Sequence, residues 1–548
     1  MSLQTEKESG IPTLTAEVAR AAFPNGNIYM RLRDEMGLLF KDEQFEQLYP
    51  QRGQPAEAPW RLSLITLMQF MEDLTDRQAA DAVRGRIDWK YALGLALDDK
   101  GFHYSVLSEF RARLVNGKAE AKLFDTILDW CREKGYLKDR GRQRTDSTHI
   151  VAAVASIQRI ELVGQTLHRI LDLLAQVAPD WLRQQARLEW YERYRQPISD
   201  YHLPKMELER RELIETIGKD GAYLLSQIYR DDAPAFLRTI PVIDIFRQVW
   251  LQNYYQEGDA ISWRQEDNIP PASIRLVSSV DIEVRVCSKR KDNWIGYKVH
   301  LTETCEASSP ELITHVETTL ATEQDNLVLN RIQTALKEKH LLPKQHAVDA
   351  GYVSAENLVD SQKNFEVDLL GPVRPDSSWQ SRDKDAFSAT QFQIDWENKK
   401  VICPMGKISS CWFPSKSRFN QPTIEVHFRR KDCKVCSSRS QCTRSQSSPR
   451  NLCLRPKELY LALQAARKRQ TTQAFWDSYA IRSGVEGTIG LAADKLGIRR
   501  SRYCGLAKTH LQNILVATAI NVKRILNWMA EIPRSPTRVS HFAALAPA

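Results

Sequence analysis

The sequence predicts a mixed α/β protein whose sheet-forming segments are separated by two long insertions and preceded by helices. Three observations lead to this prediction. Alternating, β-branched segments occur at 142–154, 294–304 and 312–320, and two shorter ones follow at 346–352 and 367–373. The residues between the first and second segments have helical periodicity, whereas residues 374–470 are polar, basic and cysteine-bearing. The length of 548 residues agrees with about three to four structural units.

The N-terminal part of the chain predicts several short helices. Apolar residues between 64 and 74 recur at three- and four-residue steps, and Asp76 can cap a second helix. A third helical segment, 103–114, carries Arg111 and Arg113 among apolar residues. A Ser/Arg face on such a helix suits DNA reading, and it equally suits a plain helical bundle.

Composition excludes a membrane span and a secretory signal. The chain is 42% hydrophobic and 26% charged, it contains no run of about 18 apolar residues, and its N-terminus, MSLQTEKESG, is polar and has no apolar core. The expected location is therefore the cytoplasm.

Positive charge is concentrated in one segment. Residues 399–470 contain 17 Lys and Arg against 3 Asp and Glu, although the whole chain has a net charge of only +9. A basic block of this kind indicates a polyanionic partner, because Lys and Arg displace counterions from phosphates. The alternative is a solvated basic face.

Two aspartates stand out by their context. Asp146 lies in the middle of a predicted strand, RTDST, where Asp is disfavoured. Asp349 ends the strand HAVD and precedes Ala350-Gly351-Tyr352. The end of a sheet strand is a usual place for a functional carboxylate, and the alternative is an Asp that caps the following turn.

A third acid, Glu486, lies in a segment predicted as one helix from about 472 past 489. Tyr479, Arg482 and Glu486 are spaced to share one face of that helix. The same helix contains three glycines, each of which costs about 1 kcal/mol relative to Ala. Close approach of a backbone, from protein or DNA, would explain them. The alternative is a surface Glu–Arg pair on a frayed helix. The three glycines are Gly484, Gly487 and Gly490.

Four cysteines are grouped by their spacing. Cys433 and Cys436 form a CxxC pair, with Cys403 before it and Cys442 after it. This set indicates a structural zinc site with four thiolate ligands. The alternatives are free thiols or a metal-free knuckle.

The motifs together resemble the DDE transposases of bacterial insertion sequences, whose catalytic domain has a ribonuclease H-like fold. TDST at 145–148 and AVDAGY at 347–352 are similar to the motifs of the first and second aspartates. GYKVHLTET at 296–304 resembles the second strand of that fold, and Tyr479, Arg482 and Glu486 match the Tyr-x2-Arg-x3-Glu signature. The helices at about 28–115 resemble the N-terminal DNA-binding domain of these proteins.

The resemblance implies a function, a site and partners. Asp146, Asp349 and Glu486 would bind two Mg²⁺ ions, for which Mn²⁺ can substitute, and would cleave the terminal inverted repeats and join the 3′ ends to target DNA. The partner is double-stranded DNA, bound by a homodimer that is associated with the nucleoid. The rivals are a ribonuclease H-like nuclease without strand transfer, and an inactive or domesticated zinc-dependent DNA-binding protein. Expected DNA contacts are Tyr479, Arg482, Lys495, Arg499, Arg429, Arg430, Lys431, Arg111 and Arg113.

One position departs from the family pattern. The Lys that follows the catalytic Glu is replaced by Ala493, so that Lys495, Arg499 or Arg500 would have to supply the phosphate contact.

The resemblance and the composition also give domain boundaries. We expect an N-terminal helical DNA-binding domain (1–125), a catalytic core (140–152, 276–373 and 471–530), a helical insertion (153–275), a basic Cys-rich insertion (374–470) and a loose tail (531–548).

Overall fold

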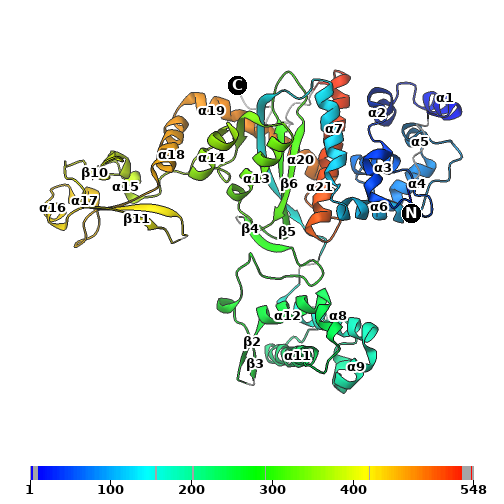
Figure 1. Ribbon diagram of the computed structural model, residues 1–548, viewed down its shortest axis with the longest axis horizontal. Helices are drawn as coiled ribbons and strands as arrows, with labels where there is room; N and C mark the ends of the chain where they lie inside the picture. The colour runs from blue at the N-terminus through cyan, green and yellow to red at the C-terminus, as the bar shows by residue number, and fades with distance from the viewer. Residues whose placement is uncertain are drawn as a thin grey trace.

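The computed structural model describes residues 2–3, 10–154, 157–199, 203–258, 260–289, 292–418, 420–533 and 545. A central mixed sheet is flanked on one side by the N-terminal helices, with a helical insertion and a separate strand-rich lobe extending from it (Figure 1). Most of the predicted tail, from residue 534 onward, lies outside the described residues apart from residue 545.

Most of the N-terminal helices share a core with the rest of the protein. Most of their buried apolar side chains belong to the same cluster as those of the sheet and of the long C-terminal helix α21 (Leu506–Met529), and a small separate cluster forms around Ala19, Met30 and Tyr91. The helix α4 begins at Asp76, but its cap is Thr75, whose hydroxyl accepts the N–H of Gln78; the prediction that Asp76 caps this helix was wrong. The helices are α1 (Thr13–Ala22), α2 (Ile28–Met36), η1 (Asp42–Leu48), α3 (Pro59–Met71), α4 (Asp76–Gly85), α5 (Ile87–Leu93), α6 (Ser105–Asn116) and α7 (Ala121–Glu133).

The central sheet is mixed. β1 pairs with β5 in antiparallel fashion and with β7 in parallel, β8 extends the parallel side, and β4 and β6 both pair with β5. Each sheet segment predicted from the sequence is present as a strand. The strands are β1 (Arg140–Val151), β4 (Arg285–Lys289), β5 (Asp292–Thr304), β6 (Ile313–Leu320), β7 (Pro343–Val348) and β8 (Asp368–Leu370).

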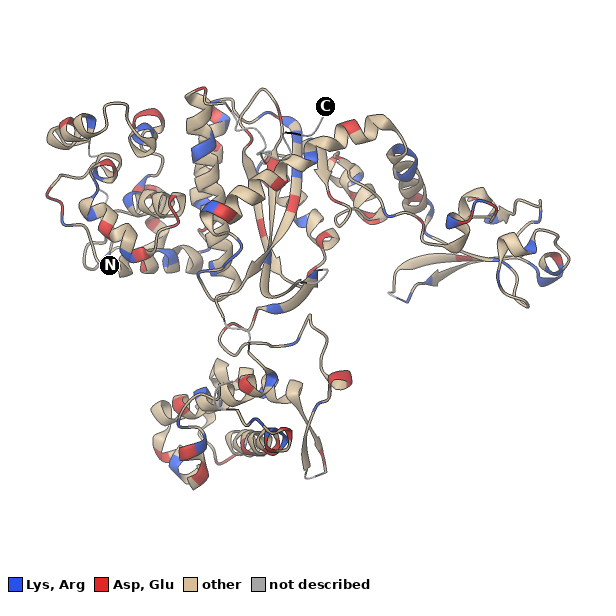
Figure 2. Ribbon diagram, turned by 180° about the vertical axis from the view of Figure 1, so that it is seen from behind, with Lys and Arg blue, Asp and Glu red and all other residues tan. Residues whose placement is uncertain are grey.

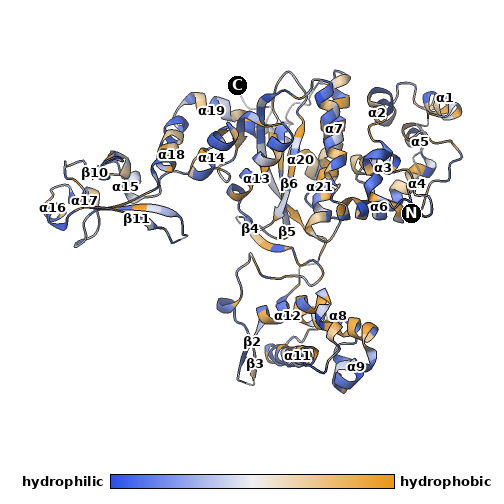
Figure 3. Cartoon of the chain, viewed as in Figure 1, coloured by the Kyte–Doolittle hydropathy of each residue, from blue (hydrophilic) through white to orange (hydrophobic). Residues whose placement is uncertain are grey.

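Helices cover the sheet and complete its core. α13 (Asp325–Glu338) follows β6, and α14 (Ala355–Phe365) lies between β7 and β8. α21 is the most apolar long helix of this unit and packs against β6, α3 and α7 (Figure 3). It therefore joins the sheet to the N-terminal helices.

The segment between β1 and β4 folds around a second buried cluster, separate from the first. The predicted helices are present there, and a short hairpin, β2–β3, follows them. The elements are α8 (Arg159–Val177), α9 (Pro179–Gln185), α10 (Leu188–Arg193), α11 (Glu207–Ile228), η3 (Ala235–Thr239), α12 (Pro241–Asn253), β2 (Tyr254–Glu257), β3 (Ala260–Trp263) and η4 (Glu266–Asn268).

The segment after β8 forms a small strand-rich lobe. Its three-stranded sheet has the order β11–β12–β13, and a two-stranded sheet, β9–β10, lies beside it in sequence. Its other elements are short. The lobe is followed by α18 (Lys457–Gln470), a helix that the polar composition of this segment did not predict. The lobe comprises α15 (Trp379–Arg382), η5 (Ala389–Gln391), β9 (Gln393–Asp395), β10 (Lys400–Ile402), β11 (Cys411–Lys416), β12 (Pro422–His427), α16 (Arg430–Lys434), α17 (Arg439–Cys442) and β13 (Asn451–Leu454).

No helix in the described part of the chain is both long and apolar enough to cross a membrane.

Candidate active site

The sheet places two of the three acids side by side. Asp146 lies in the middle of β1, and Asp349 is the first residue after β7. β1 and β7 are parallel neighbours, and Thr145 is paired with Val348, so that the next residue on each strand is one of these aspartates. Asp349 is held by its own turn, because its Oδ1 accepts the N–H of Gly351 at 2.7 Å.

Glu486 approaches from a helix. It lies in the first turn of α20 (Gly484–Leu496), and its side chain is 62% exposed. The guanidinium of Arg482 joins it to the sheet: one nitrogen donates to Glu486 Oε1 and another to Asp146 Oδ2 at 2.6 Å. Arg482 thus connects the first acid with the third.

The single helix predicted around Glu486 is interrupted. α19 (Gln473–Tyr479) is followed by a 3₁₀ turn, η6 (Ala480–Ser483), before α20 begins. The carbonyl of Ile481 accepts a hydrogen bond at 2.7 Å from Arg144 on β1, and this bond fixes the turn against the sheet. The interruption brings Arg482 and Glu486 over Asp146.

The three glycines of this segment have different surroundings. A Cβ at Gly484 would lie 2.1 Å from the Arg144 guanidinium, so that close packing by protein explains this glycine. A Cβ at Gly487 or Gly490 would meet nothing within 4 Å. Packing within the chain therefore does not explain these two.

The carboxylates influence one another's pKa and that of a neighbouring tyrosine. Burial raises the pKa of Asp146 to about 6; Arg482 opposes this rise and the neighbouring Asp349 adds to it. Burial also raises the pKa of Tyr479, which Arg482 lowers and which Asp349, Asp146 and Glu486 raise further. All three carboxylates therefore contribute to the electrostatic environment of the Tyr479 hydroxyl.

A fourth carboxylate, Asp325, lies at the same place and was missed from the sequence. It begins α13, and its Oδ2 is 3.5 Å from the hydroxyl of Ser147, the residue after Asp146. Asp325 Oδ2 and Asp349 Oδ1 both lie about 3 Å from the position of a Cβ at Gly351. Asp325 also pairs with Lys298 of β5 at 3.1 Å. An Asp in the first helical turn resembles ordinary capping, and no sequence signal distinguished it.

A buried network of ion pairs and hydrogen bonds supports the site. Glu303 of β5 is fully buried and receives Arg144 at 2.7 Å, Arg524 of α21 at 2.8 Å and the Thr488 hydroxyl of α20 at 2.6 Å. Burial alone would raise the pKa of Glu303, but Arg524 and Arg144 hold it below its usual value. The network joins two strands and two helices and so fixes α20 on the sheet.

The donor set fits hard divalent cations, because carboxylate oxygens are the ligands that Mg²⁺ prefers. As the side chains stand, however, no three His, Cys, Asp or Glu within the described ranges are close enough to hold one ion. Arg482 lies between Asp146 and Glu486. Asp146 and Glu486 therefore share a protein cation in this structure.

The residues predicted to contact DNA have different environments. Lys495 and Arg499 are exposed beyond Glu486 along α20 and its C-terminal loop, and Arg499 donates to the Thr148 hydroxyl at 3.1 Å. Arg429, Arg430 and Lys431 are exposed on the lobe, where basic residues lie along its loops and α18 (Figure 2).

Arg111 and Arg113 are engaged in packing within the protein. Arg111 is buried and pairs with Asp76, and Arg113 donates to the carbonyl of Leu48 and lies over the ring of Tyr49. These contacts support the helical-bundle interpretation of the 103–114 segment.

The comparisons with known proteins agree with the geometry. A family model described as a transposase DDE domain matches residues 402–526, which include Glu486 and the four grouped cysteines. A second, described as a transposase domain (DUF772), matches residues 17–113, in the N-terminal helices. Both are families of transposases. The resemblance to insertion-sequence DDE transposases is thereby confirmed.

Comparison with curated proteins and with solved structures gives no match.

Proposed function

We propose that this chain is a DNA transposase that cleaves at the ends of an insertion sequence and joins the 3′ ends to target DNA. The observation that carries the proposal is that three acids far apart in sequence lie near one another: Asp349 is next to Asp146 on the neighbouring strand, and Arg482 links Asp146 to Glu486. The mixed sheet that presents them supports a ribonuclease H-like core. The two transposase family matches support the same function.

In this mechanism the chain mainly positions the reacting groups. Bound Mg²⁺ would activate the attacking water or 3′-hydroxyl and stabilise the leaving oxygen. Asp146, Asp349 and Glu486 would supply its ligands. Arg482 exchanges its carboxylate partners for a phosphate of the DNA, and Tyr479 contacts the adjacent sugar–phosphate backbone. Two ends must be held together, so we propose a homodimer on DNA.

The function is tested with a donor plasmid that carries the native flanking DNA of this gene. Wild-type protein with Mg²⁺ is expected to excise the element and join it to a target plasmid, and Glu486→Ala is expected to do neither. Asp494→Ala is the matched control, since Asp494 is exposed two turns further along the same helix. Cleavage without joining would favour a nuclease, and equal behaviour of wild type and Glu486→Ala would refute the assignment.

Asp325 provides a second prediction. Asn at this position removes the charge that faces Lys298 and leaves an unpaired ammonium beside the site. Residues that support metal ligands typically contribute 10- to 100-fold to affinity or activity, and we expect cleavage to fall by about that factor and to recover in part at higher Mg²⁺. Cleavage rates measured over a Mg²⁺ titration check this; an unchanged rate throughout would remove Asp325 from the site.

A further inference from the structure

The lobe formed by residues 379–454 has a small apolar core. Its buried cluster consists of six side chains, and much of the remaining lobe is exposed or half-buried. A core of this size contributes little stability, and natural units of this kind usually gain it from a disulfide or a metal. The six residues are Phe392, Val401, Val426, Phe428, Leu452 and Leu454.

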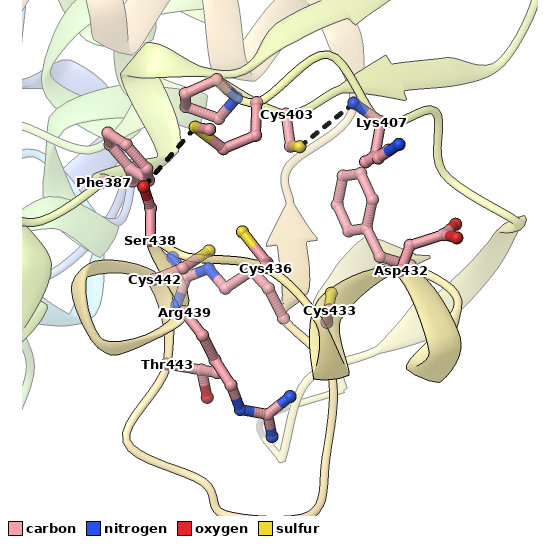
Figure 4. Close-up of a pocket in the computed structure, with 14 residues that line it drawn as sticks. Phe387, Cys403, Lys407, Asp432, Cys433, Cys436, Ser438, Arg439, Cys442 and Thr443 are labelled. Carbon is pink, nitrogen blue, oxygen red and sulfur yellow. Dashed lines mark hydrogen bonds between the residues drawn. The ribbon is translucent and has the colours of Figure 1, made fainter.

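Four thiols from three separate parts of the lobe face one small space. Cys403 follows β10, Cys433 lies in α16 with Cys436 just beyond it, and Cys442 ends α17. Figure 4 shows their sulfur atoms turned toward one another, and all four line a cavity of about 30 Å³. That volume admits a single ion.

The backbone around Cys403 positions its sulfur. The turn that follows β10 is closed by hydrogen bonds between Cys403 and Lys407 and contains Gly406 at φ +75°. The backbone N–H of Lys407 lies 3.3 Å from Cys403 Sγ and donates to it. This contact fixes the position of the Cys403 sulfur.

Charged residues line the cavity beside the thiols. They are three cations, Lys407, Arg439 and Arg450, and one acid, Asp432. The guanidinium of Arg439 is directed away from the sulfurs and donates to the carbonyls of Ser445, Gln446 and Ser448. Four thiolates around one Zn²⁺ carry a net charge of −2, and the cations exceed the acid around them by two charges.

We propose that Cys403, Cys433, Cys436 and Cys442 form a structural zinc site that holds the three parts of the lobe together. Each thiol loses its proton to solvent as its sulfur bonds to the ion, which gives a closed tetrahedral centre. Because no three such ligands within the described residues are yet at bonding distance, the sulfur atoms must move closer together on binding. The proposal does not depend on the transposase function.

The site would fix the exposed basic face of the lobe. Arg429, Arg430, Lys431 and Lys434 lie in or directly before α16, the same short helix that carries Cys433. A metal bound there sets the direction of that helix and presents four cations as one surface. Such a surface suits the phosphates of DNA, and its binding would weaken steeply with salt.

The test uses the full chain, purified without a polyhistidine tag and in reductant. Elemental analysis is expected to give about one zinc per chain, and replacement by Co²⁺ is expected to give the visible absorption of tetrahedral thiolate coordination. A chelator should remove the metal and make the lobe sensitive to protease, while the 140–373 region keeps its resistance. A protein with reduced thiols and no zinc would overturn the proposal, and so would disulfides among these four cysteines.

Matched variants locate the metal. Cys433→Ser is expected to lower the zinc content severalfold, whereas Cys453→Ser should leave it unchanged, because Cys453 is exposed on β13 of the same lobe and lies outside the cavity. Equal loss in both variants would place the metal elsewhere. The measurements on wild-type protein stand even if Cys433→Ser fails to fold.

Discussion

Asn in place of Asp349 is expected to reduce DNA cleavage by roughly 10³-fold or more while leaving binding to the element's ends nearly unchanged. The substitution removes the charge of a proposed metal ligand. It keeps the shape, and an Asn oxygen can still accept the N–H of Gly351 that orients Asp349 in its turn. The loss should therefore lie in the chemical step.

Two measurements on the same protein separate these effects. Cleavage of a labelled end fragment reports the chemistry, and a gel-shift titration reports binding. Asp360→Asn, one helix further along in α14, is the matched control and should behave as wild type. A parallel loss of binding and cleavage would show that Asp349 acts in DNA recognition or folding.

The second large effect is expected at Glu303. Gln at this position removes the anion that Arg144 and Arg524 share, although Arg144 keeps Glu311 at 3.0 Å. Removing one partner of a buried ion pair costs about 3–5 kcal/mol when the remaining charge is uncompensated, and because Glu311 compensates part of it we expect the lower end of that range. We expect a clearly lower melting temperature of the catalytic core, measured by calorimetry.

The control for Glu303 is a carboxylate of the same type at the surface. Glu366 is 83% exposed and pairs with Arg140 at 4.0 Å. An exposed pair contributes about 0–1 kcal/mol, so Glu366→Gln should hardly shift the transition. Equal shifts in the two variants would show that the buried network does not stabilise the core.

The strands of the sheet could be predicted from the sequence. Alternating β-branched segments, such as the one around Asp146, directly indicate a strand with one buried face. The sequence also placed Asp349 at the end of its strand. The prediction from sequence failed where a local structure is determined by a residue far away in the sequence. The 3₁₀ turn before Glu486 depends on Arg144, a residue more than 300 positions earlier, which no local periodicity can reveal.

Other errors have local causes. The helix α18 has a long polar face and no fully buried residue, so its apolar signal was too weak to notice in a basic segment. Arg111 and Arg113 were expected to contact DNA because a Ser/Arg face suits a DNA-reading helix, but in the structure Asp76 and Tyr49 engage them. Asp325 resembled a helix-start residue, and only the folded chain brings it to Asp349.

The two ends of the helical insertion lie beside each other. Val154 and Ile157 on the way in, and Leu276 and Val277 on the way out, border one cavity, and Arg159 donates across the seam to Asn253. The insertion thus leaves and rejoins the rest of the chain at neighbouring positions, as a long loop would. Loop-closure entropy grows slowly, by about 0.6 kcal/mol for each doubling of length. A whole folded domain can therefore be accommodated between β1 and β4 while Asp146 keeps its register.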